Sequence, residues 1–156
     1  KPIVLDADGL AIFPSLKGPL DNLVITPHLG ELSRILNIEK KILLKNFIQI
    51  VKKFLANYSG VAVIKHVPAC IINGQKMSIN CTGNPGLATA GSGDVLSGVI
   101  ASFIAQKMNS YDACRLSSYF HGLAADNQIK YKGIRGLIAS DLPLEIAKVI
   151  NEYENL

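Results

Sequence analysis

The sequence predicts an α/β fold in which flanking helices cover a mostly parallel sheet with an appended β-hairpin. The first observation is an alternation of short apolar segments with helical segments, which is typical of parallel strands joined by crossover helices. The second is the Asn73-Gly74 dipeptide between two further apolar segments, because Asn-Gly favours a tight hairpin turn. No internal repeat or linker interrupts the 156 residues, so we expect one domain.

The first half of the chain alternates strand and helix. Three short apolar runs are the expected strands, at residues 3–7, 23–26 and 61–65. We expect the first two to be buried on both faces, as strands of a parallel sheet are. Helices are expected at residues 31–36 and 40–57. The longer one carries an apolar stripe with helical spacing: Leu44, Phe47, Ile48, Val51, Phe54 and Leu55.

The second half begins with the hairpin and continues with helices. Residues 69–72 and 76–79 are the expected antiparallel strands, and a turn that includes Gln75 joins them. Ser110 and Ser140 are the expected N-caps of the last two helices. The three expected helices span residues 94–107, 110–128 and 140–152.

Composition and charge exclude several classes of protein. With 49% hydrophobic and 18% charged residues, the chain is not expected to be disordered. The longest weakly polar run, residues 95–105, falls well short of the roughly 20 residues that a membrane-spanning helix needs. The net charge is +4, but many of the lysines lie on one expected helix as a solvated face, so no nucleic-acid partner is expected. Cys70, Cys81 and Cys114 lack C-x-x-C spacing, which favours reduced thiols in the cytoplasm over a zinc site or disulfides.

The most informative segment is the glycine-rich loop at residues 82–93, together with the helix that follows it. Glycine lets the backbone approach a ligand, and the free N–H groups and positive dipole end of a helix start attract anions. Asp94 stands at this start, where a carboxylate suits a base that takes a proton from an attacking hydroxyl. The loop matches neither a Walker A loop nor a dinucleotide fingerprint. The pattern alone is equally compatible with glycines that only form turns and an Asp94 that only caps the helix.

Residues 84–98 read NPGLATAGSGDVLSG and resemble the signature of the ADP/ATP-dependent NAD(P)H-hydrate dehydratases, members of the ribokinase-like superfamily. Four other stretches resemble segments of that family in the same order: VLDAD at 4–8, TPHLGEL at 26–32, HGLAAD at 121–126 and GLIASDL at 136–142. The resemblance implies a single ribokinase-like domain over residues 1–156. Family domains are longer, so it also implies that the chain covers the C-terminal part and that an N-terminal part is missing.

Members of this family repair NADH and NADPH that have been hydrated at the nicotinamide ring. The resemblance implies a hydro-lyase that dehydrates the S epimer of hydrated NADH or NADPH, driven by hydrolysis of ADP or ATP, with Mg²⁺ as cofactor. Phosphorylation of the ring hydroxyl followed by elimination of phosphate makes chemical sense, because hydroxide is a poor leaving group. The implied setting is cytoplasmic metabolite repair by a homo-oligomer, with the missing N-terminal segment supplied in the same chain or as a separate one.

The resemblance also assigns roles to individual residues. Asp94 is the implied base and a substrate contact, His28 a second substrate contact, and Glu31 a residue that holds Mg²⁺ through water. The implied nucleotide-binding residues form two segments: Lys65, His66, Val67, Pro68, Ala69, Gly91, Ser92 and Gly93. Without the resemblance, His28 would be interpreted as a capping or surface histidine. His121, on an apolar helix face, is expected to be structural with or without it.

Three positions depart from the family pattern. His66 and Ala69 replace the glycine and the polar residue of a Lys-Gly-x-x-Thr segment, and Ala11 stands where an asparagine is common.

Two other functions stay open at this point. One is another ribokinase-like kinase, of the thiazole or pyrimidine type, and the other is a non-catalytic remnant that binds nucleotide. We also expect residues 3–7 to leave an open apolar edge and the isolated chain to be insoluble or partly unfolded.

Overall fold

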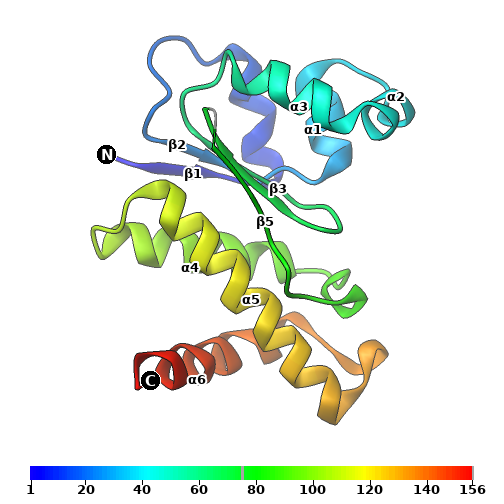
Figure 1. Cartoon of the computed structure of the whole chain (residues 1–156), viewed down its shortest axis with the longest axis vertical. Coiled ribbons are helices and arrows are strands. Elements are labelled where there is room, and N and C mark those ends of the chain that lie inside the picture. Colours follow the sequence, from blue (N-terminus) through cyan, green and yellow to red (C-terminus); the bar gives the residue numbers. More distant parts are fainter. Residues whose placement is uncertain (75, 156) are drawn as a thin grey trace.

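The computed structural model describes residues 1–74 and 76–155, and a five-stranded mixed sheet lies at its centre (Figure 1). Three parallel strands, β1 (Ile3–Leu5), β2 (Leu23–Ile25) and β3 (Val61–Ile64), run in this order from one edge. The hairpin strands β4 (Cys70–Asn73) and β5 (Lys76–Ile79) follow in antiparallel orientation. The predicted fold class and hairpin are therefore confirmed, whereas Gln75 of the predicted turn lies outside the described residues.

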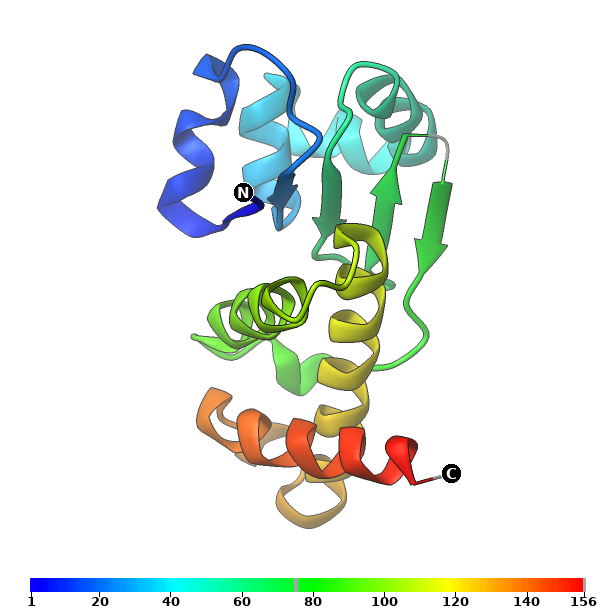
Figure 2. The same ribbon diagram turned by 90° about the vertical axis from the view of Figure 1, so that its left-hand side faces the viewer.

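Helices cover both faces of the sheet. One face carries the 3₁₀ helix η1 (Ala7–Ser15) and the short helices α1 (Leu29–Leu36), α2 (Lys40–Lys45) and α3 (Phe47–Leu55). The other face carries α4 (Ser92–Ala105) and α5 (Ser110–Lys132). Helix α6 (Leu142–Glu154) packs against α5 on the side away from the sheet (Figures 1 and 2). Within the described ranges, every helix is too short or too polar to cross a bilayer.

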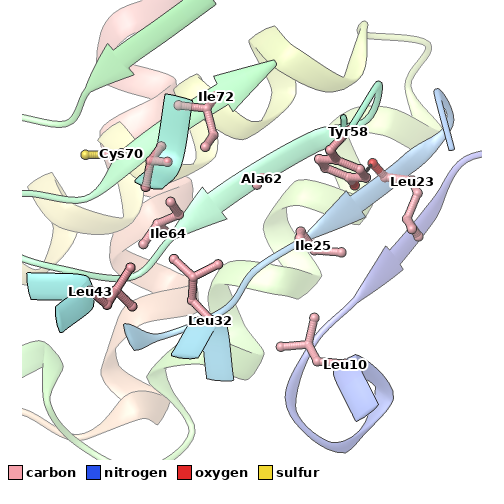
Figure 3. Close-up of a cluster of buried hydrophobic side chains, with 11 residues drawn as sticks. Leu10, Leu23, Ile25, Leu32, Leu43, Tyr58, Ala62, Ile64, Cys70 and Ile72 are labelled. Carbon is pink, nitrogen blue, oxygen red and sulfur yellow. Dashed lines mark hydrogen bonds between the residues drawn. The ribbon is translucent and has the colours of Figure 1, made fainter. Parts of the chain in front are cut away.

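The central strands are buried on both faces because their side chains alternate between two apolar cores. Ile25 and Ile64 belong to the core under η1 and α1–α3 (Figure 3). Val24 and Val63, their neighbours along the strands, belong to the core under α4 and α5. The prediction of two-faced burial is thus confirmed for β2.

The same prediction is wrong for β1. Ile3 is 55% exposed, and Val4 and Leu5 are only partly buried. The physical reason is the position of β1 at the edge of the sheet, where it pairs with β2 on one side only in the described part of the chain. The strand is also shorter than predicted, since Asp6 already caps η1.

The predicted lysine-rich helix is divided into α2 and α3. Asn46 between them has φ −122° and ψ 30°, outside the helical region. The break shifts the apolar stripe, so Leu43 is fully buried in place of Leu44, and Leu44 and Ile48 are exposed. The side chain of Leu55, which belongs to the predicted stripe, is outside the part that the structure describes.

Both predicted N-caps are wrong. Asn109, one residue before Ser110, has the extended φ and ψ of an N-cap, and its Oδ1 accepts a 3.0 Å hydrogen bond from Asp112 N. Ser140 lies inside a 3₁₀ turn, η4 (Ala139–Asp141), that precedes α6. The extra turn therefore delays the start of α6 to Leu142.

Candidate active site

Three strand ends and the first turn of α4 meet at one edge of the sheet. Because β1, β2 and β3 are parallel, the residues that follow them, Asp6, Thr26 and Lys65, lie on the same side. Lys65 Nζ donates to Asp6 Oδ1 over 2.6 Å, and Ser97 Oγ in α4 donates to Asp6 Oδ2 over 2.6 Å. A Cβ built on Gly93 would lie 3.3 Å from Lys65 Nζ, so the ammonium packs against the start of α4.

The environment keeps Asp6 ionised. Burial by itself raises the pKa of the Asp6 carboxyl, but hydrogen bonds from Lys65 and Ser97 and the charge of Lys65 outweigh burial and hold the pKa below its ordinary value. The two side chains of the ion pair are largely removed from water, with Lys65 24% and Asp6 12% exposed. The site therefore contains a fixed, compensated positive charge.

The first turn of α4 offers backbone donors beside this charge. Gly91 is the N-cap, with φ +86°, a left-handed conformation that explains why a glycine stands there. Val95 N makes the first bond back along the helix, to Gly91 O at 3.1 Å. The N–H groups of Gly93 and Asp94 precede that ladder, as the first N–H groups of a helix do, and are placed to bind an anion. The Asp94 side chain is exposed. Gly91 rather than Asp94 is the N-cap, and Asp94 lies in the first turn, where the helix dipole favours a carboxylate.

Residues of the C-terminal half hold the glycine-rich loop in place. The Asp126 carboxylate accepts hydrogen bonds from Gly83 N at 2.8 Å and from Asn84 Nδ2 at 2.9 Å. His121 Nε2 lies 3.0 Å from Ser92 O and, as predicted for a structural histidine, is buried on the inner face of α5. The HGLAAD segment thus supports the loop from behind.

His28 forms the N-cap of α1 at the end of β2. Its Nδ1 accepts hydrogen bonds from Gly30 N and Glu31 N, at 2.9 and 3.1 Å, so the ring proton lies on Nε2. Glu31 Oε2 in turn accepts from His28 N at 2.7 Å, which completes a capping box. An isolated bridge pairs His28 with Lys65. Since the His28 side chain is still 52% exposed, the histidine can cap α1 and contact a ligand.

The turn between β3 and β4 carries the other predicted nucleotide-binding residues. The His66 ring packs on the Phe47 ring of α3, with centroids 5.7 Å apart. Val67 and Pro68 are exposed, and Ala69 is partly buried, with its carbonyl bonded to Asn80 N at 2.9 Å. The His66 side chain is therefore packed against α3.

The structure brings most of the predicted site residues to one edge of the sheet. The Lys65 ammonium lies beside Gly93, and the backbone of Lys65 pairs with that of His28. Ser92 and Asp94 flank Gly93 in the same helical turn. Sequence reasoning missed the roles of Asp6 and Ser97. The available signal for Asp6 was its place directly after an apolar strand, within VLDAD.

Comparison with known proteins agrees with this geometry. A family model described as NAD(P)H-hydrate dehydratase matches residues 1–148. A bifunctional NAD(P)H-hydrate repair enzyme of Coxiella burnetii is 35% identical over 151 residues, which are 96% of this chain and 31% of that protein. An ADP-dependent (S)-NAD(P)H-hydrate dehydratase of Neisseria meningitidis is 36% identical over 150 residues, 91% of this chain and 51% of that protein.

Solved structures give the same result. The Bacillus subtilis ADP/ATP-dependent NAD(P)H-hydrate dehydratase, co-crystallised with ATP and Mg²⁺ and soaked with CoA, superposes with a TM-score of 0.86 at 28% identity, over 97% of this chain and 56% of that one. The chain thus spans about half the length of that structure and of the Neisseria relative, and a third of the bifunctional one. The fold, the glycine-rich turn and the family model agree, and the chain belongs to the NAD(P)H-hydrate dehydratase family.

Proposed function

We propose that this chain forms the nucleotide-binding side of an enzyme that uses ADP or ATP to dehydrate the S epimer of hydrated NADH or NADPH. The observation that carries the proposal is the first turn of α4, where the Lys65 ammonium lies against Gly93 beside the N–H groups of Gly93 and Asp94. A phosphate group matches this arrangement, because backbone donors, a helix dipole and a cation all favour negative charge. Gly91, Ser92 and Gly93 would cradle the phosphates.

The nucleotide's remaining contacts would come from the adjacent turn. Residues 66–69 follow Lys65 directly and partly face solvent, so they are placed for the adenine nucleotide when its phosphates lie at α4. His66 and Ala69 differ from the family's glycine and polar residue. The His66 ring packs on the Phe47 ring of α3, so the added side chain has a contact within the protein.

Asp94 is placed to act as the base. Its exposed carboxylate follows Gly93, so a substrate hydroxyl that attacks the terminal phosphoryl group would lie within reach of it. Asp94 would take the hydroxyl proton while phosphorus bonds to the hydroxyl oxygen and the nucleotide leaves. Phosphate, now carrying that oxygen, would then leave its ring carbon while the neighbouring ring carbon loses a proton to solvent, which restores the ring double bond of the reduced nicotinamide. The N–H groups near Gly93 would stabilise charge on the transferring group.

His28 and Glu31 would serve the substrate and the metal. The His28 side chain is 52% exposed and carries its proton on Nε2, 3.5 Å from Glu31 Oε1, so it could donate to the hydrated nucleotide beside Glu31. Within the described residues, no three His, Cys, Asp or Glu side chains gather as a metal site. Mg²⁺ commonly keeps several waters and binds substrate phosphates, so the residues fit a metal carried by the nucleotide, with Glu31 contacting it through water. Bound Mg²⁺ would neutralise charge on the phosphates.

We place this activity in the cytoplasm, with support from three free cysteines among the described residues.

The direct test of the proposed function is to incubate the protein with hydrated NADH or NADPH, Mg²⁺ and either ADP or ATP. Nucleotide-dependent return of the absorbance of the reduced nicotinamide ring, with release of one phosphate per ring restored, is the expected result. Nucleotide binding without any dehydration would favour a non-catalytic domain, and phosphorylation of a thiazole or pyrimidine alcohol instead would identify a different kinase.

A further inference from the structure

We propose that Asp6 is a positioning residue for the nucleotide phosphate: its carboxylate holds the Lys65 ammonium against the first turn of α4. The inference rests on the proposed function, because that function assigns the phosphate to this turn. Asp6 itself would not touch the nucleotide. It would act through Lys65, by determining where the positive charge lies before the ligand arrives.

The carboxylate of Asp6 is held at both oxygens. Oδ1 accepts from Lys65 Nζ at 2.6 Å and from Ala7 N at 2.9 Å, and Oδ2 accepts from Ser97 Oγ at 2.6 Å. Thr26 Oγ1 lies 3.4 Å from Ser97 Oγ, so the end of β2 supports the same group. The first residue of η1, the residues that follow β2 and β3, and Ser97 of α4 therefore fix the carboxylate, and through it the ammonium.

The position of Lys65 needs such a partner. The N-terminal end of a helix carries a partial positive charge, which disfavours a nearby cation. Lys65 Nζ nevertheless lies 3.3 Å from where a Cβ on Gly93 would be. Asp6 offsets that repulsion and uses only one of the three N–H donors of the ammonium. An ammonium held at this end of the helix can use its remaining N–H donors and its charge to bind an anion there.

A simple stabilising ion pair would have different consequences. It would tie the end of β1 to the end of β3, and its loss would lower stability without distinguishing phosphate-containing from phosphate-free ligands. Simple neutralisation of Lys65 would also differ, because removal of the Asp6 charge would then strengthen phosphate binding. Positioning alone predicts weaker binding of ligands with a phosphate and unchanged binding of ligands without one.

The test is a double-mutant cycle on ligand affinity, measured by calorimetry with ADP and with adenosine. We expect Asp6→Asn to weaken ADP binding about tenfold, as misplacement of one charge-assisted contact would, and to leave adenosine binding unchanged. In a Lys65→Met background, Asp6→Asn should have no further effect on ADP, because its action passes through Lys65. Asp112→Asn, which breaks the exposed pair with Arg115 at the start of α5, is the matched control and should change neither affinity.

Asp6→Glu gives a second variant that keeps the charge. It should also weaken ADP binding, because one added methylene displaces the ammonium. If Asp6→Asn and Asp6→Glu both bind ADP as the wild type does, or if adenosine binding falls in step with ADP binding, the inference is wrong while the proposed function stands. Absence of any ADP or ATP binding by the wild-type protein would overturn the proposed function and this inference with it.

Discussion

The imidazole Nε2 of His121 lies 3.0 Å from the carbonyl oxygen of Ser92, although 29 residues separate the two in the chain. His121 is on α5 and Ser92 is in the first turn of α4, so this contact joins the helix behind the glycine-rich loop to the proposed phosphate site. Burial lowers the pKa of His121 to about 4, and the hydrogen bond with Ser92 only partly opposes that effect. The neutral ring, with its proton on Nε2, is the form that donates to the carbonyl.

Stability should therefore depend on pH through His121. An unfolded chain protonates this ring near pH 6.5, whereas the folded protein keeps it neutral down to about pH 4. Between these values the unfolded state binds more protons, so stability falls as the pH falls and levels off below pH 4. The loss should reach about 3 kcal/mol. Chemical denaturation as a function of pH measures it. His121→Gln, which does not titrate, should flatten the curve in this window, and an unchanged slope would contradict the assignment.

Gly93→Val should weaken nucleotide binding. A Cβ at this position would lie 3.3 Å from Lys65 Nζ and 3.7 Å from Asp6 Oδ2, so added volume displaces the ammonium from the helix start. Backbone strain contributes nothing, because Gly93, unlike Gly91, has no positive φ. Calorimetry with ADP should register a loss of at least about tenfold. Gly98→Ala in the same helix meets nothing within 4 Å and is the matched control. Equal affinity for the Gly93 and Gly98 variants would argue against the site.

Two variants of His28 should separate its capping role from its proposed substrate contact. His28→Ala removes the acceptor for Gly30 N and Glu31 N and should cost about 1 kcal/mol of stability. His28→Asn keeps a good N-cap but removes the imidazole, so its stability should be near that of the wild type. If the ring contacts the hydrated nucleotide, both variants should raise KM for that substrate. A normal KM for the His28→Asn enzyme would show that His28 only caps α1 and does not contact the substrate.

The free edge of β1 should drive self-association of residues 1–156 expressed alone. Ile3 is 55% exposed on an edge strand, and exposed apolar edges pair readily with other strands. Light scattering over a dilution series should detect the association, and Ile3→Lys should reduce it. Ile12→Lys changes a similarly exposed isoleucine in η1, outside the sheet, and should have little effect. A monodisperse wild-type chain with cooperative unfolding would refute the prediction.

The strands and the hairpin could be predicted from the sequence, because they depend on interactions between residues that are close along the chain. The parallel strands follow from short apolar runs, and the hairpin follows from Asn73-Gly74, because each depends on residues close in sequence. The break at Asn46 was not predictable in the same way, because the lysine-rich segment is helical on both sides of it and contains neither glycine nor proline.

The site was predictable only in part. The glycine-rich turn and Asp94 are contiguous, so a sequence motif identifies them. Asp6 and Ser97 are 91 residues apart and meet only because β1 and α4 pack together. Nothing in the sequence near Ser97 indicates that its hydroxyl donates to a carboxylate at the end of β1. Tertiary contacts of this kind require the structure.

Asp94→Asn tests whether this carboxylate is the base in a nucleotide-driven dehydration. Turnover of hydrated NADH or NADPH and affinity for ADP or ATP should be measured on the same preparation. We expect turnover to fall about 10²–10⁴-fold, the usual contribution of a general base, with nucleotide affinity retained because the N–H groups of the turn are untouched. Turnover near that of the wild type would remove Asp94 from the proposed mechanism.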